Sequence, residues 1–264
     1  MKAFARLILG LFPRTVLQRL ANVLVPILDV WYRGNNFTDP INDKSYRKFL
    51  PYGYVKIRPN VLSPGTLSLE RHRLIWLYLK NETNFFQSPA KVLHMAPEKA
   101  FISRLKKLPH LDYISCDLES PLADIKADIC NLPFDDASFD WILCNHVLEH
   151  IPNDQKAMQE LFRVLKPGGK ALLQVPLDPN RNTTFEDNSI TDKAERTKIF
   201  GQYDHVRVYG LDYFDKLRKI GFEVDELQFG KSLTADERKR FGVVENEYIP
   251  LCLRPIDAQK QSLL

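Results

Sequence analysis

The sequence has few cysteines, little excess charge and no Cys-x-x-Cys pair. Its four cysteines, Cys116, Cys130, Cys144 and Cys252, sit in or beside apolar runs, which indicates buried, reduced thiols in a cytosolic protein. With 11 glycines and 17 prolines in 264 residues, 44% of them hydrophobic and 27% charged, the composition excludes a collagen-like repeat, a disulfide-stapled miniprotein and a disordered tail. The length fits one medium domain with attachments or two small domains.

The net charge of +4 is concentrated at the N-terminus. Residues 1–33 carry five basic side chains and one acidic one, so they account for 5 − 1 = +4 and the rest of the chain is neutral. This distribution argues against a broad basic face for nucleic acid.

The same N-terminal segment has the period of an amphipathic helix. Only nine uncharged residues separate Arg19 from Asp29, whereas a membrane-spanning helix needs about 20 apolar residues, so we predict no transmembrane segment. Such a basic helix lies in a membrane interface or packs against protein, and the sequence leaves both alternatives open. Its apolar face comprises Val16, Leu17, Leu20, Val23, Leu24, Ile27, Leu28 and Trp31.

From about Ser88 the sequence alternates between strand-like and helix-like runs, which predicts a parallel sheet with helices on both faces. A helix over Leu67–Leu79 precedes the first strand, residues 34–66 are predicted to be irregular, and Lys166-Pro167-Gly168-Gly169 is expected to stop a helix directly before a strand. The predicted strands are Lys91–Ala96, Leu111–Cys116, Phe139–Asn145, Ala171–Val175, Phe222–Leu227 and Glu247–Leu253, and the predicted helices are Glu98–Leu108, Asn153–Leu165 and Leu211–Ile220.

Polar residues follow the predicted strands, where an open parallel sheet binds its ligands. His94-Met95-Ala96-Pro97-Glu98 follows the first strand. Asp117 follows the second, 21 residues after Ala96, near the offset of about 20 residues at which an acid receives ribose hydroxyls.

The run from Ala127 to Val175 resembles the class I S-adenosylmethionine-dependent methyltransferases, type 11 group. The likeness rests on LPFDDASFD, WILCNHVLEHI and RVLKPGGKALLQVP, in this order. It implies a Rossmann-like α/β fold, with a seven-stranded, mostly parallel sheet and a reversed final hairpin. It also implies a cofactor site made of His94, Met95, Ala96, Pro97, Glu98, Asp117, Leu118, Asp128, Ile129, Asn145 and His146.

The first loop departs from this family. The family has an acid followed by spaced glycines, whereas His94 stands in the place of the acid and no glycine follows. We interpret this as a different loop path, in which Glu98 binds the amino group of the cofactor. A weakened, non-binding site is the alternative.

A second resemblance covers residues 39–73. Related bacterial methyltransferases carry a zinc ribbon ahead of a Leu-Glu-Arg-His-Arg helix, here Leu69–Arg73, but Asp39, Asn42, Ser63 and Thr66 replace the four thiolates. Because structural zinc prefers Cys and His ligands, we predict a relic ribbon without metal, maintained by Phe49, Tyr52 and neighbouring apolar contacts. The predicted organisation is therefore a basic amphipathic helical segment (1–33), an irregular relic ribbon (34–66), a methyltransferase domain (67–258) and a tail (259–264).

Histidines are the candidate catalytic groups, because a base near the transferred methyl group assists a hydroxyl acceptor. We select His146 and His205 as catalytic candidates and Tyr203, His205 and Arg207 as acceptor-binding candidates. The alternative for the last three is a cluster that merely orders a lid. No metal is predicted.

The predicted function is methyl transfer to a small-molecule, lipid or lipid-linked glycan acceptor. We expect a cytoplasmic protein, with residues 1–33 at the inner membrane face. A non-catalytic, cofactor-binding scaffold is the competing hypothesis. The sequence does not give the acceptor or the oligomeric state.

Overall fold

The computed structural model of the chain describes residues 24–53 and 57–256. The chain divides into two compact units, Met1–Leu77 with Thr234–Val244, and Tyr78–Leu233 with Glu245–Leu264. This division falls inside helix α3 (Glu70–Asn81), whereas the sequence placed a boundary at residue 67. Residues 1–23 of the predicted basic segment and the predicted tail lie outside the described residues.

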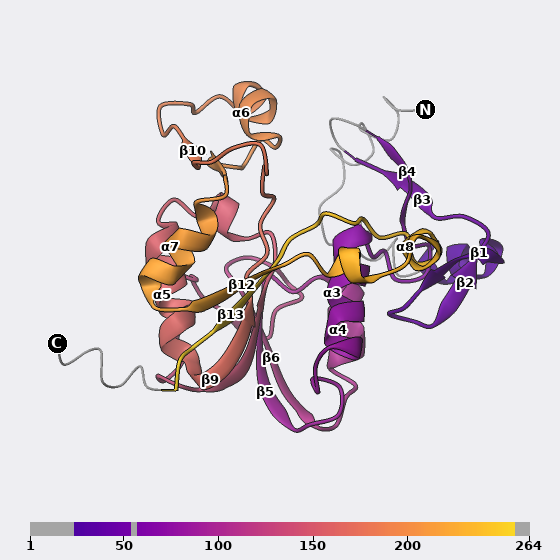
Figure 1. Ribbon diagram of the computed structural model, residues 1–264, viewed down its shortest axis with the longest axis horizontal. Coiled ribbons are helices and arrows are strands. Elements are labelled where there is room, and N and C mark those ends of the chain that lie inside the picture. The colour runs from indigo at the N-terminus through magenta and orange to yellow at the C-terminus, as the bar shows by residue number, and fades with distance from the viewer. Residues whose placement is uncertain (1–23, 54–56, 257–264) are drawn as a thin grey trace. The chain divides into compact units, whose positions relative to one another are not determined.

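The second unit contains a seven-stranded sheet (Figure 1), in the order β12-β13-β9-β8-β5-β6-β7. Strands β5 to β9 are parallel, and β13 runs antiparallel to both β9 and β12. The predicted α/β fold with a reversed last hairpin is therefore confirmed. The strands are β5 (Ala90–Met95), β6 (Leu111–Asp117), β7 (Ile125–Lys126), β8 (Phe139–Cys144), β9 (Leu165–Leu172), β12 (Glu223–Leu227) and β13 (Ile249–Leu253).

Helices cover both sides of this sheet. In Figure 1, α5 (Asp154–Val164) and α7 (Tyr213–Ile220) lie on one side and α4 (Lys99–Leu105) on the other. Between β9 and α7 the chain forms a two-stranded sheet of β10 (Phe185–Glu186) and β11 (Arg207–Val208), with α6 (Lys193–Phe200) between these strands. Two 3₁₀ helices, η1 (Leu148–His150) and η2 (Phe229–Ser232), complete the unit.

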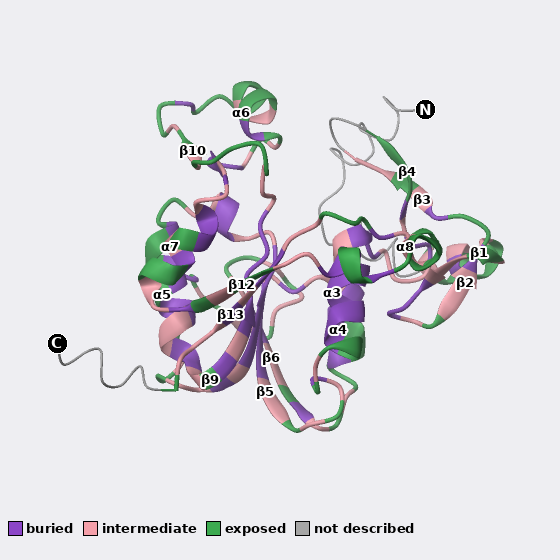
Figure 2. Cartoon of the chain, viewed as in Figure 1, coloured by how far each residue is buried: buried purple, intermediate pink, exposed green. Residues whose placement is uncertain are grey.

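The central strands are continuous apolar runs because parallel strands are covered on both faces. Val92 and Leu93 of β5, and Ile142 and Leu143 of β8, are all buried. Figure 2 shows buried residues running through the sheet, whereas exposed residues lie on the outer helix surfaces and in loops.

Helix α5 begins and ends where the sequence indicates. The side chain of Asn153 caps it by accepting a hydrogen bond from the amide of Lys156. The strand that follows begins earlier than predicted, because β9 starts at Leu165. Lys166-Pro167-Gly168-Gly169 thus forms a bulge inside β9, between the pairs Phe139–Leu165 and Trp141–Lys170. Gly168 has a φ of +77°, which glycine adopts without steric cost.

Residues 34–66 of the first unit are not irregular, and this prediction is wrong. They form two antiparallel hairpins. Their strands are short and rich in turn-forming residues, so the sequence shows no strand-like pattern there. The strands are β1 (Arg33–Asp39), β2 (Lys44–Tyr46), β3 (Leu50–Tyr52) and β4 (Arg58–Leu62). Helix α8 (Ala235–Phe241) belongs to the same unit and has no buried residue.

Hydrogen bonds connect the turns that carry the four ribbon positions. The buried carboxylate of Asp39 accepts hydrogen bonds from Thr66 Oγ1 at 2.5 Å, Ser68 Oγ at 3.2 Å and the amide of Ile41 at 3.0 Å. Gly65 lies so close to the first turn that a Cβ there would be 2.1 Å from the Tyr46 hydroxyl. Side-chain hydrogen bonds from Thr66 and Ser68 to Asp39 thus join the two turns.

An aromatic and cationic stack lies beside these turns. The predicted core residue Phe49 is buried, with its ring 5.1 Å from that of Phe37 and 4.5 Å from the Arg73 guanidinium. Arg73 donates to the carbonyl oxygens of Val61, Ser68, Phe241 and Gly242. These bonds tie β4, α3 and α8 together within the first unit.

Residues 24–31 form a helix with an exposed apolar side. Ile27 and Trp31 are 58% and 69% exposed, and Leu24 and Val30 are also exposed. Asp29 instead faces the ribbon, where it accepts hydrogen bonds from Lys44 and Tyr46. No helix among the described residues is both long and apolar enough to span a bilayer.

The Asp39 network gives a stability prediction. We expect Asp39→Ala to lower the free energy of unfolding by about 2–4 kcal/mol, because it leaves three buried donors without their acceptor. Chemical denaturation of the full chain measures this loss. The matched control is Asp236→Ala on the exposed face of α8, for which the change stays within about 0.5 kcal/mol. Equal stability of the two variants would show that the network does not hold the turns together.

Candidate functional site

The carboxyl ends of three neighbouring strands meet at one edge of the sheet. Met95 at the end of β5 pairs with Cys116 of β6 on one side and with Cys144 of β8 on the other. The next residues along the three strands, Ala96, Asp117 and Asn145, therefore emerge side by side. The structure brings together the predicted cofactor residues at these positions.

The loop after β5 follows a path that normally favours glycine. Ala96 has a φ of +46°, and its amide donates to the carbonyl oxygen of Cys116 at 2.8 Å. A non-glycine residue in this left-handed region costs about 1–2 kcal/mol. The loop therefore makes a left-handed turn at a residue that carries a methyl group.

His94 and Met95 lead into this loop at the end of β5 with their side chains buried, so a ligand would meet their backbone. Their side chains are 0% and 2% exposed. Pro97 is likewise buried. In this loop only the backbone and Glu98 remain for direct contact with a cofactor.

The role of His94 is to hold Glu98. The Tyr113 hydroxyl lies 2.7 Å from His94 Nδ1, and His94 Nε2 lies 2.7 Å from Glu98 Oε2. Burial and the nearby charges of Glu98 and Asp124 raise the pKa of Tyr113, so its hydroxyl stays protonated and donates to Nδ1. His94 Nε2–H then donates to the Glu98 carboxylate, which also accepts from Asn145 Nδ2 at 3.4 Å.

Asp117 is fixed by its own loop. Its Oδ1 accepts hydrogen bonds from the amides of Glu119 at 2.8 Å and Ser120 at 2.6 Å. No hydrogen bond to Oδ2 is found among the described residues, so this oxygen is available to ligand hydroxyls. Leu118 is 62% exposed beside it and offers an apolar surface to a base.

Asp128 and Ile129 follow β7. Asp128 is exposed, and its Oδ1 accepts from the amide of Cys130 at 2.8 Å. Ile129 points into the hydrophobic core, so its predicted contact with an adenine ring involves only its backbone.

The buried amide of Asn145 indicates whether a cofactor fits at these strand ends. Its side chain is buried, yet Oδ1 receives no hydrogen bond from the described part of the chain. A buried amide oxygen without a donor is costly, and the ammonium group of a bound amino acid moiety would satisfy it. Together with Asp117 Oδ2, it gives acceptors for both ends of S-adenosylmethionine.

Three histidines surround a buried carboxylate that the sequence analysis missed. Glu149 in η1 lies with its Oε1 3.3 Å from His146 Nδ1 and 3.9 Å from His150 Nε2. The His150 and His205 rings meet edge to face at 4.7 Å. The motif Asn145-His146-Val147-Leu148-Glu149-His150 contained the signal, because one tight turn brings its last residues back toward His146.

The guanidinium of Arg207 is fully engaged with protein groups. Its guanidinium is buried and donates to the carbonyl oxygens of Leu148, Ile151 and Pro152, and to both carboxylate oxygens of Glu186. These bonds use all five N–H groups. Arg207 therefore ties β10 and β11 to η1. Tyr203 is exposed, with Lys193 Nζ 5.7 Å from its ring centre.

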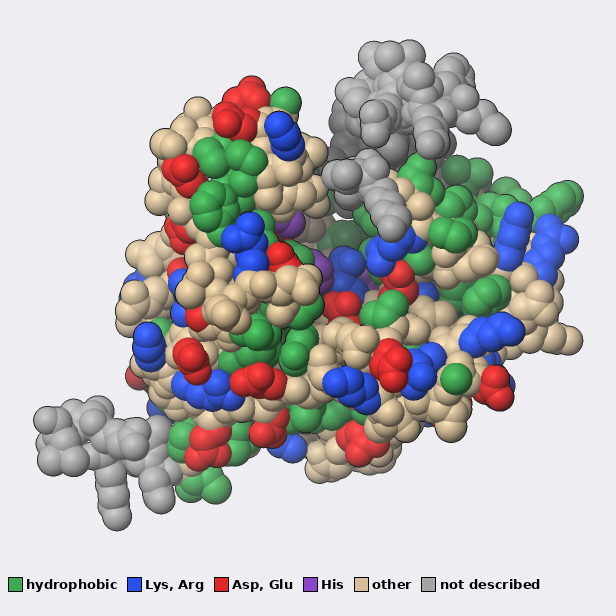
Figure 3. All heavy atoms as spheres, turned by 45° about the horizontal axis from the view of Figure 1, so that its top comes forward, with side chains coloured by type: hydrophobic (Ala, Val, Ile, Leu, Met, Phe, Trp, Pro, Cys, Tyr) green, Lys and Arg blue, Asp and Glu red, His purple; other side chains and the backbone are tan. Residues whose placement is uncertain are grey.

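A surface pocket of about 350 Å³ lies beside His205. It is mainly apolar, and Asp178 and His205 supply polar groups. Histidine side chains are visible on the face in Figure 3, where basic and acidic side chains are interspersed. The pocket is lined by Pro176, Leu177, Asp178, Pro179, Phe200, His205, Arg207 and Val208.

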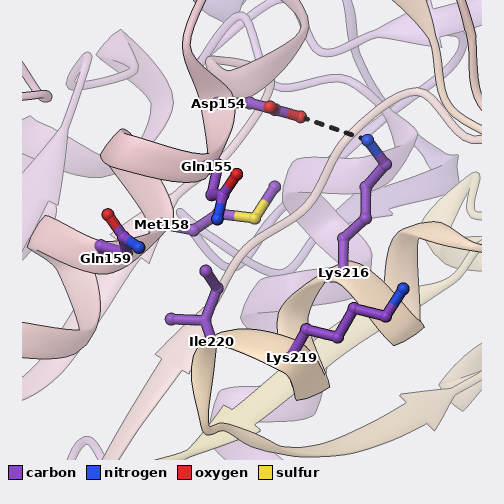
Figure 4. A pocket seen from close by; sticks show the side chains of 7 residues that line it. All are labelled: Asp154, Gln155, Met158, Gln159, Lys216, Lys219 and Ile220. Carbon is purple, nitrogen blue, oxygen red and sulfur yellow. Dashed lines mark ion pairs between the residues drawn. The ribbon is translucent and has the colours of Figure 1, made fainter.

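A second pocket, of about 240 Å³, lies between α5 and α7 (Figure 4). Lys216 points toward Asp154 across it, with 4.0 Å between Nζ and Oδ2. None of the predicted site residues lines this pocket.

The conformation of Ala96 gives a paired prediction. Ala137 also has a positive φ, +51°, in the loop that leads into the amino end of β8, whereas the candidate site lies at the carboxyl ends. We expect Ala96→Gly and Ala137→Gly each to raise the free energy of unfolding by about 0.5–1 kcal/mol, because both relieve left-handed strain. Ala96→Val and Ala137→Val lower stability alike, but only Ala96→Val adds bulk where a cofactor approaches. Calorimetric titration with S-adenosylhomocysteine separates the two valine variants, and equal affinities would place Ala96 outside the site.

The family profile described as "Methyltransferase domain" matches residues 81–173. Among curated proteins, the chain is similar to a 2-phytyl-1,4-naphtoquinone methyltransferase of Nostoc punctiforme, with 44% identity over 20% of this chain and 23% of that protein. It is also similar to a tRNA U34 carboxymethyltransferase of Nautilia profundicola, with 25% identity over 60% of this chain and 48% of that protein. The chain thus spans less than half the length of each of these two relatives.

Among solved structures, the [4+2]-cyclase SpnF shares the fold, with a TM-score of 0.50 and 14% identity over 72% of this chain and 84% of that one. At this identity the likeness concerns the fold alone. The profile match covers β5, β6 and β8, whose ends carry Ala96, Asp117 and Asn145. Over residues 81–173 the chain is therefore similar to a methyltransferase domain.

Proposed function

We propose that the protein transfers a methyl group from S-adenosylmethionine to a hydroxylated small-molecule or lipid-linked acceptor. The observation that carries this proposal is that Asp117 Oδ2 and Asn145 Oδ1 lie at the ends of the two strands that flank β5, next to the histidines around Glu149. These two oxygens have hydrogen-bonding capacity that the described residues leave unused.

Different residues of the chain bind different parts of the cofactor. Asp117 accepts the ribose hydroxyls, Leu118 covers the base and the exposed Asp128 receives its amino group. Asn145, held next to Glu98 by their hydrogen bond, accepts from the amino acid end. When bound, S-adenosylmethionine supplies an electrophilic methyl group on a sulfonium. Holding an acceptor in line with that carbon contributes about 7–11 kcal/mol through proximity alone.

The histidines assist the acceptor. His205 Nδ1 lies 3.1 Å from the carbonyl oxygen of Phe200, and since a carbonyl only accepts, Nδ1 carries the proton and Nε2 the lone pair. Burial lowers the pKa of His205 below its ordinary value, although the charge of Glu149 opposes this shift. His205 is therefore neutral at pH 7 and is able to accept a proton from a hydroxyl group, and His146 is the second candidate for this role.

The acceptor pocket lies outside the segment shared with the family. The profile match ends at residue 173, whereas the pocket is built from residues 176–208. Relatives named for demethylmenaquinone and sterol methylation support a small-molecule acceptor in general terms. The lining is mostly apolar, with Asp178, His205 and Arg207 as its polar residues, and it supports an acceptor with an apolar body and a hydroxyl group.

The exposed apolar side of residues 24–31 supports action at a membrane surface, on the cytoplasmic face. Trp and Leu or Ile side chains on one side of a basic helix insert into the lipid interface. Packing against another protein is the alternative for this surface.

The second candidate function is a cofactor-binding or scaffold protein without catalysis. It is favoured by the strained, glycine-free loop at Ala96. Cofactor titration followed by a methyl-transfer assay distinguishes it from the enzyme.

The cofactor site is tested with Asp117→Asn. This variant keeps Oδ1 for the amides of Glu119 and Ser120 but replaces Oδ2 with a donor. We expect the Kd for S-adenosylmethionine to rise about 10- to 100-fold, equivalent to about 1.5–3 kcal/mol, because charge-assisted bonds to the ribose are lost. The control is Asp112→Asn near the other end of β6, whose side chain is 66% exposed. No heat with the wild-type chain, or equal Kd values for both variants, would refute this site.

The membrane surface is tested with the double variant Ile27→Ser/Trp31→Ser. We expect the full chain to sediment with anionic phospholipid vesicles and the double variant to remain in the supernatant, since apolar burial in the interface is lost. Ile256→Ser removes a similarly exposed but isolated apolar side chain and should sediment like the wild type. Equal sedimentation of wild type and double variant would mean that this surface contacts protein instead.

A further inference from the structure

The second unit holds a cluster of potential metal ligands, of which only His205 has a part in the proposed function. Glu149, His150 and His205 each offer one ligand atom, and these atoms lie within 4.8 Å of one another. Glu149 and His150 belong to η1 after β8, whereas His205 precedes β11. The two segments are fixed to each other by a backbone bond from the amide of Val206 to the carbonyl oxygen of Glu149 at 2.9 Å.

Both histidines have a defined tautomer. His205 Nδ1 faces the carbonyl oxygen of Phe200 at 3.1 Å, and His150 Nδ1 faces that of Asp204 at 3.3 Å. Each Nδ1 must therefore carry the proton, which leaves the lone pair on Nε2. A backbone carbonyl that receives the far N–H is the usual support of a metal-binding histidine, because it fixes both the ring orientation and the tautomer.

The carboxylate between them is paired only loosely, with two histidine nitrogens. Glu149 is 1% exposed, and both of its oxygens are buried without a well-aligned hydrogen bond. The nearest nitrogens are His146 Nδ1 at 3.3 Å and His150 Nε2 at 3.9 Å. Because a buried carboxylate is costly unless a cation or donors compensate it, this group points to a bound cation.

We propose that Glu149, His150 and His205 bind a divalent transition-metal ion of the Zn²⁺ class. Two imidazole nitrogens and one carboxylate oxygen form a ligand set that suits such ions, and three protein ligands leave a coordination position open. Ligand bonds of about 2.0–2.2 Å bring the donor atoms to about 3.4 Å from one another. Side-chain shifts of roughly an ångström achieve this from the present separation.

The site is accessible from one side. The His150 side chain is 29% exposed, and His205 lines the pocket of about 350 Å³ that we assign to the acceptor. The open position thus faces a space that a ligand oxygen can enter. Metal binding does not depend on the proposed methyl transfer. When the metal is bound, His205 Nε2 is engaged and His146 remains as the base.

The test uses the tag-free full chain, stripped of metal with a chelator and titrated with Co²⁺ alone. We expect visible d–d absorption that saturates at one Co²⁺ per chain and disappears when Zn²⁺ is added. Zinc analysis after dialysis should give one equivalent, and Zn²⁺ should raise the thermal midpoint by mass action.

Variants assign the signal to these residues. His150→Gln, His205→Gln and Glu149→Gln should each lose the d–d absorption and the thermal shift, whereas His110→Gln, on the loop before β6, should keep both. Circular dichroism and S-adenosylmethionine titration establish that each variant is folded, and a variant that fails this check is replaced by the next of the three. A wild-type chain that shows native circular dichroism but no d–d absorption would overturn the proposal. The proposal would also be overturned if folded variants of the three ligand residues still bound one equivalent of metal. Because the readout is the metal itself, a chain that binds metal but transfers no methyl group would refute only the proposed function.

Discussion

The register of β5 between β6 and β8 is the constraint on which the site depends. Met95 is paired on both sides, with Cys116 and with Cys144, so three strand ends stop at one level. A slip of one residue in either pair would turn Asp117 or Asn145 to the other face of the sheet. The buried apolar side chains of these strands resist such a slip, because it would expose them to the wrong environment. Packing far from the ligand therefore fixes the polar groups that meet it.

The first loop is held by a chain of side-chain hydrogen bonds. His94 stands at the strand end, and a carboxylate stands four residues later, at Glu98. The His94–Glu98 hydrogen bond of 2.7 Å returns this carboxylate to the strand end, next to Asn145. The missing glycines are replaced by Ala96, whose left-handed conformation carries a small strain. Hydrogen bonds that run from Tyr113 through His94 and Glu98 to Asn145 therefore fix this loop.

The sequence predicted the parts of the fold that local patterns encode. The long apolar strands and the capped helix α5 were found because period and capping are local signals. The hairpins of residues 34–66 were not, since strands of three residues exist only through their pairing. Asp117 and Asn145 could be placed by their position after strands. The role of Arg207 could not be predicted from the sequence, because its carbonyl partners lie 55 to 59 residues away along the chain. Glu149 was missed for a related reason, since its burial depends on the turn that follows β8.

The two sides of the site are built from different kinds of structure. Groups for the cofactor lie at strand ends within the sheet, whereas His205 and the acceptor pocket lie on the segment between β9 and α7. Arg207 holds that segment to η1 through backbone carbonyls, so a substitution there would move His205 relative to Glu149 without touching either. The same anchoring orients His205 whether its Nε2 accepts a proton or binds a metal ion. Both roles use the lone pair of a neutral imidazole, and the carbonyl oxygens of Phe200 and Asp204, which face Nδ1 of His205 and His150, place that lone pair on Nε2 of the neutral ring. The chemistry on the acceptor side therefore depends on backbone positions rather than on the identity of a single side chain.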